Sequence, residues 1–402
     1  MDEGIDAGAG PSRARVVAML GIAQTLAWGS SYYLPAVLAG PIAAGTGVAP
    51  AWVFGAFSAS LLISAVAGPY VGRAIDRRGG RGILVLSNIV LAAGLFALAG
   101  AGGPVGLFAA WAILGLGMAL GLYDAAFAAL ACFYGTHARG PITGITLMAG
   151  FASTVSWPLT SLLNGAVGWR ETCLIWGALN LVVGLPLNAL LPRAVPRTAA
   201  RTAARRVGWH PRREMWLLAF VFAAAWFVTG AMAAHLPDLL ERAGATPFEA
   251  IAAAAMVGPA QVAARLVEFI VLRRIHPLVS ARIAATLHPI GAAVLAVAGP
   301  IGAAPFAILY GAGNGLLTIA RGTVPLALFG PNDYGERTGL LGAPARAAQA
   351  LAPLLFGLML GAMGLAVILV SAGLCLAALA ALLCLRPNAG APGETRLARK
   401  ET

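Results

Sequence analysis

Long apolar runs separated by short polar segments dominate the chain. Each run reaches about 20 residues, the length that a helix needs to cross the hydrocarbon core of a bilayer. The alternating segments of about ten residues that a transmembrane β-barrel requires are not seen. The pattern predicts an all-α polytopic membrane protein with twelve transmembrane helices, at residues 16–40, 52–72, 82–100, 104–133, 141–165, 169–191, 215–240, 248–272, 278–299, 302–329, 338–362 and 364–385.

A polar stretch in the middle of the chain divides these helices into two sets of six. Short motifs recur between the sets, since Thr143-Gly144 returns 195 residues later as Thr338-Gly339. The repeat predicts two pseudo-symmetric six-helix bundles, an architecture that transporters use with a site between the halves. The predicted domains are a cytoplasmic tail (1–15), the first bundle (16–191), a basic cytoplasmic linker (192–214), the second bundle (215–385) and a cytoplasmic C-terminal tail (386–402).

Basic residues lie mostly on one side of the predicted membrane. Of 27 Lys and Arg residues, 22 fall in segments on the side of the N-terminus and two on the other side. Cytoplasmic segments carry such an excess, so both termini are expected in the cytoplasm. The net charge of +12 then reflects topology and contact with anionic lipids rather than a nucleic-acid partner. Arginine far outnumbers lysine, which favours GC-rich coding and hence a bacterial inner membrane.

Composition and missing motifs exclude several classes of protein. Apolar residues make up 59% of the chain and charged residues 10%, against about 25% charged in soluble domains. No G-x-x-x-x-G-K-S/T loop is present, so the chain carries no ATPase of that kind. H-E-x-x-H and G-x-S-x-G are also missing, and nothing supports an enzyme or a cofactor.

One polar segment resembles a family signature. The stretch Gly72-Arg-Ala-Ile-Asp76-Arg77-Arg-Gly-Gly-Arg81 is similar to the loop G-x-x-x-D-R/K-x-G-R/K-R/K between spans 2 and 3 of the major facilitator superfamily. The resemblance implies a structural and gating role for Gly72, Asp76, Arg77 and Arg81. A weaker echo, Ala264-Arg-Leu-Val-Glu268, follows at an offset of 192.

Three arginines lie inside apolar spans. Arg265, Arg321 and Arg346 fall at a similar predicted depth, and a charge there is costly unless it is paired or faces water. Guanidinium groups bind carboxylate oxygens bidentately, so these residues are candidate ligands for an organic anion. Two alternatives stay open: Arg265 pairs with Glu268 at i+3, and Arg321 is a gate residue rather than a ligand.

A second resemblance concerns the arginine of span 8. Gln261-Val-Ala-Ala-Arg265 resembles the segment in which monocarboxylate transporters bind the substrate carboxylate, with Gln261 in place of an acid. Oxalate:formate antiporters similarly place cations in spans 8 and 11, which matches Arg265 and Arg346. The resemblance implies that both arginines contact the substrate.

Asp124 and Arg321 are expected to form an inner gate. The offset of 195 maps Ala126 onto Arg321, so Asp124 lies two residues from the pseudo-symmetric position. The alternative is that Asp124 stays hydrated while Arg321 pairs with Asp333 or Glu336. Further candidates for the cavity wall are polar or aromatic residues of spans 1 and 10, namely Trp28, Tyr32, Tyr33 and Asn314.

The sequence therefore predicts a secondary transporter that works by alternating access on a small organic anion, a mono- or dicarboxylate. Efflux of drug-like or amphipathic compounds is the alternative, because aromatic residues also abound. A polytopic membrane enzyme or lipid-handling protein is the remote alternative. The expected partners are a small-molecule substrate and membrane lipids, with the chain as a monomer.

Overall fold

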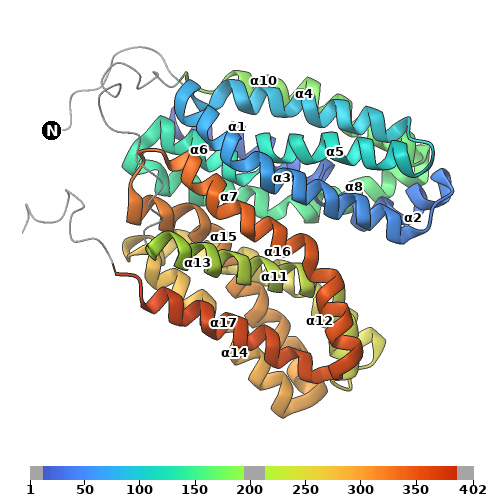
Figure 1. The fold of residues 1–402 in the computed structure, drawn as a ribbon, viewed down its shortest axis with the longest axis vertical. Helices are drawn as coiled ribbons and strands as arrows, with labels where there is room; N and C mark the ends of the chain where they lie inside the picture. Colours follow the sequence, from blue (N-terminus) through green and yellow to red (C-terminus); the bar gives the residue numbers. More distant parts are fainter. Residues whose placement is uncertain (1–11, 194–212, 387–402) are drawn as a thin grey trace, which may run out of the picture.

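Every regular element of the described chain is a helix. The structure, a computed structural model, describes residues 12–193 and 213–386 (Figure 1). Most of the predicted tails and linker, at 1–11, 194–212 and 387–402, lies outside the described residues. The elements of the first half are α1 Arg13–Ser30, α2 Pro35–Thr46, α3 Pro50–Arg78, α4 Gly80–Ala99, α5 Gly103–Gly121, α6 Tyr123–Tyr134, η1 Gly135–Ala138, α7 Arg139–Met148, η2 Ala149–Phe151, α8 Ala152–Val167, α9 Trp169–Leu179, η3 Asn180–Gly184 and α10 Leu185–Ala189.

The second half repeats this pattern with fewer breaks. Its elements are α11 Arg213–Arg242, α12 Pro247–Ala255, α13 Val257–Ile270, η4 Leu272–Arg274, α14 Pro277–Ala298, η5 Gly299–Gly302, α15 Ala303–Phe329, α16 Tyr334–Met363, η6 Gly364–Ala366 and α17 Val367–Leu383. The π segment η3 continues the helical path of its span, whereas the 3₁₀ segments η5 and η6 lie at the junctions between two spans.

Eight helical stretches of the described residues are long and apolar enough to cross a membrane. Three of them, Gly103–Val167, Pro277–Phe329 and Tyr334–Leu383, are 65, 53 and 50 residues long. Each of these holds two spans, because about 20 helical residues already cover the hydrocarbon core. The first span, α1 with α2, is additional to these eight stretches, and a turn at residues 31–34 breaks it. The predicted all-helical fold with twelve spans is confirmed.

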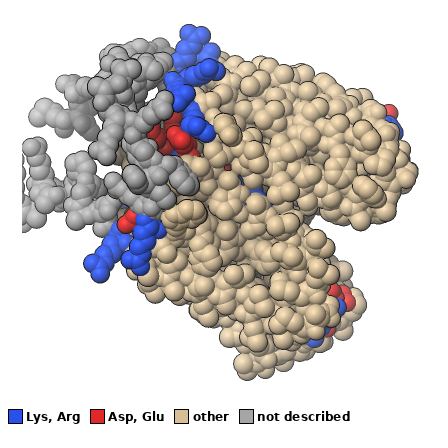
Figure 2. Space-filling view, in the orientation of Figure 1, with Lys and Arg blue, Asp and Glu red and all other residues tan. Residues whose placement is uncertain are grey.

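The two halves form two lobes that meet at one end and separate at the other. In Figure 1 the lobes converge where α1 begins and α17 ends, and they diverge toward α2 and α12. Figure 2 shows the surface hollowed between the lobes at the diverging end. It also shows charged side chains gathered at the two ends, with only a small basic patch on the surface between them on this face, as a membrane-spanning protein requires. We call the converging end, where Arg77 and Arg78 end α3, the basic end.

Glycines bring the backbones of the two halves into contact at the basic end. A Cβ atom on Gly72 of α3 would collide with the carbonyl group of Gly335 of α16. One turn away, a Cβ atom on Gly339 would lie 2.5 Å from the carbonyl oxygen of Gly68. Small residues spaced by four allow helices in membranes to approach this closely. The α3–α16 contact therefore depends on the absence of side chains at four positions.

Two helix breaks position the polar residues of the interior. Leu122 adopts an extended conformation between α5 and α6, so Asp124 falls in the first turn of α6, where the helix dipole favours a negative charge. The side-chain amide of Gln24 donates a hydrogen bond to the carbonyl of Gly121 at this break (2.6 Å). The other break separates α1 from α2. It lies between Gly29 and Pro35, and glycine and proline are residue types that loosen a helix.

The signature segment is helical rather than a loop. Residues 72–78 continue α3, and only Gly79 separates this helix from α4. Gly79 has φ +81°, a conformation that glycine adopts without strain. Arg77 and Arg78 favour continuation of α3, because basic side chains stabilise the last turn of a helix. The helix therefore continues six residues beyond the predicted end of span 2 at residue 72.

We expect Gly72→Ala to loosen the basic end. The added methyl group meets backbone atoms of α16, which cannot rotate away, and overpacking of this kind costs about 1–3 kcal/mol. Gly82→Ala is the matched control, since a Cβ atom there meets nothing within 4 Å. The measurement is the thermal unfolding of both purified variants in detergent. Equal unfolding temperatures for the two variants would contradict the proposed close contact.

Candidate functional site

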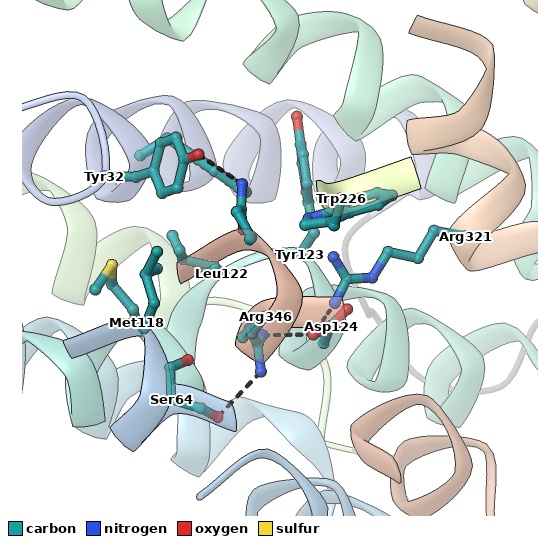
Figure 3. A pocket seen from close by; sticks show the side chains of 12 residues that line it. Tyr32, Ser64, Met118, Leu122, Tyr123, Asp124, Trp226, Arg321 and Arg346 are labelled. Carbon is teal, nitrogen blue, oxygen red and sulfur yellow. Dashed lines mark hydrogen bonds and ion pairs between the residues drawn. The ribbon is translucent and has the colours of Figure 1, made fainter. Parts of the chain in front are cut away.

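A pocket lies between the two halves at the level of the helix breaks. Figure 3 shows it with its lining side chains. The first half contributes α1, α3, α5 and α6, and the second half contributes α11, α15 and α16. The lining residues are Trp28, Tyr32, Leu61, Ser64, Met118, Leu122, Tyr123, Asp124, Trp226, Arg321, Arg346 and Gln349.

A single carboxylate joins two arginines across the pocket. Oδ2 of Asp124 accepts a hydrogen bond from Nη2 of Arg321 at 2.7 Å and another from Nη2 of Arg346. The same guanidinium of Arg346 donates through Nη1 to the carbonyl of Ser64 (3.1 Å). All three charged side chains are about 8% exposed. The single carboxylate of Asp124, in α6 of the first half, therefore contacts both α15 and α16 of the second half (Figure 3).

This cluster is electrostatically incomplete. Buried ions are tolerated when they are paired and hydrogen-bonded, yet one carboxylate here serves two guanidinium groups. Oδ1 of Asp124 has no hydrogen-bond partner among the described residues. The ring of Trp226 lies 4.4 Å from the guanidinium carbon of Arg321, close enough for a cation–π interaction. The charged side chains of the pocket lining thus carry one net positive charge.

Close packing leaves little room around the ion pairs. A Cβ atom on Gly342 would lie 2.9 Å from Oδ2 of Asp124 and 3.0 Å from Nη2 of Arg321. A Cβ atom on Gly68 would lie 3.0 Å from Nη1 of Arg346. The glycines of α3 and α16 therefore admit both the backbone contact between the halves and the side chains of the pocket.

Aromatic rings form the remaining wall. The ring of Trp28 lies 5.1 Å from that of Tyr32 and 4.9 Å from that of Tyr123, in edge-on and tilted arrangements that aromatic pairs favour. The hydroxyl of Tyr32 accepts a hydrogen bond from the amide of Gln349 (2.6 Å), a second contact between the halves. The wall offers apolar surface next to the charged cluster.

Two further contacts join the halves at the basic end. The carboxylate of Asp76 accepts hydrogen bonds from the backbone N–H groups of Gly335 (2.9 Å) and Glu336 (2.8 Å). These groups begin α16, where the unpaired N–H groups and the helix dipole favour an anion. Arg73 also lies 3.6 Å from the carboxylate of Glu336. Asp76 of the first half therefore caps a helix of the second half.

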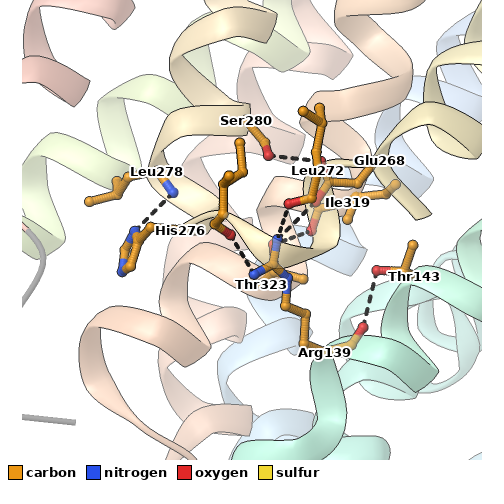
Figure 4. Close-up of polar contacts among 10 residues, drawn as sticks. Arg139, Thr143, Glu268, Leu272, His276, Leu278, Ser280, Ile319 and Thr323 are labelled. Carbon is orange, nitrogen blue, oxygen red and sulfur yellow. Dashed lines mark hydrogen bonds and ion pairs between the residues drawn. The ribbon is translucent and has the colours of Figure 1, made fainter. Parts of the chain in front are cut away.

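The counterpart on the opposite side of the pseudo-two-fold axis is Glu268. Its carboxylate accepts hydrogen bonds from Arg139 of α7 (3.2 Å) and Ser280 of α14 (2.7 Å), as Figure 4 shows. Arg139 also donates to the carbonyl groups of Leu272 and Ile275. The sequence echo between Asp76 and Glu268 thus corresponds to two related contacts between the halves.

Arg265 lies outside the pocket lining. Its guanidinium is 3.4 Å from the carbonyl oxygen of Thr146 in α7 and 3.4 Å from the amide oxygen of Gln261. The alternative that Arg265 pairs with Glu268 is wrong, because Glu268 bonds to Arg139 and Ser280 instead. A Cβ atom on Gly150 would collide with the guanidinium of Arg265.

The other predicted residues divide between the pocket and its surroundings. Asn314 accepts a hydrogen bond from Thr229 (3.0 Å), and Tyr33 packs against Trp28, but neither lines the pocket. The alternative for Asp124 is wrong: the residue is buried and bonded to Arg321 rather than hydrated. Arg77 is exposed at the end of α3. Arg81 donates to the carbonyl of Leu191 (3.4 Å).

Sequence reasoning missed Trp226, Gln349 and Arg139. Trp226 lies in an uninterrupted apolar span, although Thr229 one turn away marks the same face as polar. Gln349 is three residues from Arg346 and shares its helix face. Arg139 was assigned to a loop, but the offset of 195 places its neighbour Gly140 opposite Gly335. No group of three His, Cys, Asp or Glu residues that could hold a metal ion occurs in the described parts of the chain.

We expect Arg139→Ala to destabilise the protein far more than Glu268→Gln does. The first change leaves a carboxylate of 2% exposure with only a hydroxyl partner, which costs about 3–5 kcal/mol. The second change removes the charge and keeps the shape. Thermal unfolding in detergent measures both, and the double variant should recover much of the loss. Small and similar losses for the two single variants would show that the pair is solvated rather than buried.

The chain is similar to a known protein family and to a curated protein. A model of the Major Facilitator Superfamily matches residues 20–323. An uncharacterised 38 kDa protein in the 23S RNA operon of Thermoproteus tenax is 34% identical over 136 residues, or 34% of this chain and 35% of that protein. The chain thus matches about a third of the length of this curated relative.

Two solved structures have a similar fold. The human organic anion transporter MFSD10 (TETRAN) has a TM-score of 0.69 and 16% identity, with 92% of this chain and 100% of that chain covered. The E. coli fucose:proton symporter FucP has a TM-score of 0.72 and 14% identity, with 93% and 99% covered. At these identities the likeness establishes the fold alone. The family match, which covers residues 20–323, shows that the chain belongs to the Major Facilitator Superfamily, and this membership indicates a transporter rather than an enzyme.

Proposed function

We propose that the chain is a secondary active transporter that moves a small organic anion across the cytoplasmic membrane by alternating access. The observation that carries the proposal is the pair Arg321 and Arg346, buried in the pocket with one carboxylate between them. Each guanidinium group presents five N–H donors, which is more than a single carboxylate oxygen can accept. The substrate's anionic group would bind these donors, and the rings of Trp28, Tyr32 and Trp226 would contact its apolar body.

The alternative, efflux of drug-like compounds, draws support from the aromatic wall. The net positive charge of the lining disfavours cationic drugs, because a cation would meet an uncompensated guanidinium in a site of low dielectric. The names of the two solved structures include an organic anion transporter and a sugar symporter, so they do not choose between substrates. The charged cluster therefore favours an anion. Arg265, Tyr33 and Asn314 stay predicted contacts that a substrate would reach only after the halves move.

We also propose that Asp124 with Arg321 forms the inner gate. The ion pair lies on the diverging side of the basic-end contacts, because Arg346 of the same cluster is ten residues further along α16 than Glu336, which Asp76 contacts. If the basic end faces the cytoplasm, the cluster seals the inner side while the pocket faces outward. Asp76 and Glu268 would reinforce the seal at the helix ends. Opening inward then requires exchange of these contacts, and the two states need differ by only a few kcal/mol.

The orientation in the membrane is part of this proposal. Arg77 and Arg78 at the basic end would face the cytoplasm and anionic lipid headgroups, with both termini inside. A bacterial inner membrane is the proposed location. A monomer suffices, because one chain supplies every residue of the pocket lining.

Uptake into proteoliposomes tests the function. We expect uptake of a labelled carboxylate to fall by about tenfold or more in Arg346→Gln and Arg321→Gln, because each loses charge-assisted hydrogen bonds to the anion. The matched control is Arg282→Gln, which removes a guanidinium bonded to the carbonyls of Leu382 and Leu385, outside the pocket. A panel of mono- and dicarboxylates with and without a pH gradient identifies the substrate and the coupling ion.

Two outcomes would contradict the proposal. Uptake that survives both pocket variants as well as it survives Arg282→Gln would place the anion site elsewhere. Efflux of neutral or cationic compounds without transport of any carboxylate would support the drug-efflux alternative instead.

A further inference from the structure

The pocket lining contains more basic than acidic side chains. Of the lining residues, Asp124 is the acid and Arg321 and Arg346 are the bases. Both bases bond to the same oxygen, Oδ2, while Oδ1 is buried and finds no partner in the described parts of the chain. One carboxylate neutralises the charge of one guanidinium group only, so the lining keeps one positive charge.

We propose that Asp124 is an internal counterion that sets the valence of the transported anion at one. This inference rests on the proposed function, anion transport through the same pocket. Asp124 holds the two guanidinium groups together and supplies half of the negative charge that they require. The substrate supplies the other half, so a monoanion is favoured over a dianion of the same shape.

The reason is the cost of uncompensated charge in a dry site. A monoanion brings the lining to neutrality, whereas a dianion leaves one negative charge and a neutral ligand leaves one positive charge. Desolvation of the second carboxylate of a dianion is then not offset by a third cation in the lining. The buried positions of all three side chains make this difference large, since water screens the charges poorly there.

Neighbouring charges do not change the comparison. Arg265 lies outside the lining, bonded to the carbonyl of Thr146, and its charge is the same in every variant considered below. Arg139 and Glu268 form an ion pair with each other. The valence preference therefore depends on the one residue that can be altered without removing a cationic ligand, Asp124.

The chemistry of the wall suggests the probes. Aromatic rings of Trp28, Tyr123 and Trp226 lie next to the charged cluster, so aromatic carboxylates match the chemistry of both features. The cavity measures about 20 Å³, so the two halves must part to admit such a ligand. Phthalate and its monomethyl ester share one skeleton and differ by one charge at neutral pH. Succinate and its monomethyl ester form a second, aliphatic pair. Binding to the purified protein is measured by calorimetry, which does not require the transport cycle to turn over.

The expected result is a reversal of preference. Wild type should bind the monoester more tightly than the diacid, and Asp124→Asn, whose lining carries two positive charges, should shift the affinity ratio toward the diacid by about tenfold or more. Asp124→Asn combined with Arg321→Gln restores a single positive charge and should restore the monoester preference. Asp124→Glu is the charge-preserving control. The ratio is measured on one sample, so partial unfolding of a variant cancels.

The outcomes separate the inference from the function on which it rests. If wild type transports carboxylates but binds monoester and diacid equally, or if Asp124→Asn leaves the ratio unchanged, the valence role is overturned and anion transport stands. The same holds if the double variant keeps the preference of Asp124→Asn. If wild type neither binds nor transports any carboxylate of either pair or of the uptake panel, anion transport fails, and the inference falls with it.

Discussion

A buried carboxylate shared between two guanidinium groups of the other half is the constraint on which the interior depends. Asp124 reaches this position because the chain breaks at Leu122 and restarts as α6, with the acid in the first turn. Arg321 and Arg346 reach it because Gly342 and Gly68 leave the space that side chains would fill. Such a cluster contributes little net stability, because desolvation offsets much of the attraction, but removing one member is costly. An arrangement of this kind suits a contact that must form in one state and be exchanged in another.

The basic end applies the same logic twice, once on each side of the pseudo-two-fold axis. Asp76 accepts backbone N–H groups at the start of α16, and Glu268 accepts the side chain of Arg139 at the start of α7. The two contacts differ in chemistry: one uses a helix terminus and the other an ion pair. A rocking motion of the halves would form or break the Asp76 and Glu268 contacts together. The close backbone contact at Gly72 brings Asp76 near the start of α16. Glu268 is reached instead by the long side chain of Arg139.

Much of this could be predicted from the sequence, because membrane spans and internal repeats leave strong local signals. The twelve spans follow from apolar length, the break near Pro35 from its residues, and the contact between Asp124 and Arg321 from the repeat offset. Partners set by packing between distant helices left no such signal. Arg265 has Glu268 one turn away, yet the side chains point to different neighbours, the carbonyl of Thr146 and Arg139. Trp226 is one apolar residue among many until the fold places it over Arg321.

The central claim is that the Asp124–Arg321 ion pair closes the inner side of an anion transporter. A charge swap tests it most directly, with uptake measured alongside the distance between spin labels on the two halves at the basic end. Asp124→Arg and Arg321→Asp should each abolish most uptake and lengthen that distance, because like charges then face each other in a buried site. The double swap keeps one acid and two bases in the lining, although Arg346 loses its carboxylate at position 124, and it should restore part of the uptake and the short distance. A folded double variant that restores neither, or single variants that keep the wild-type distance, would contradict the account.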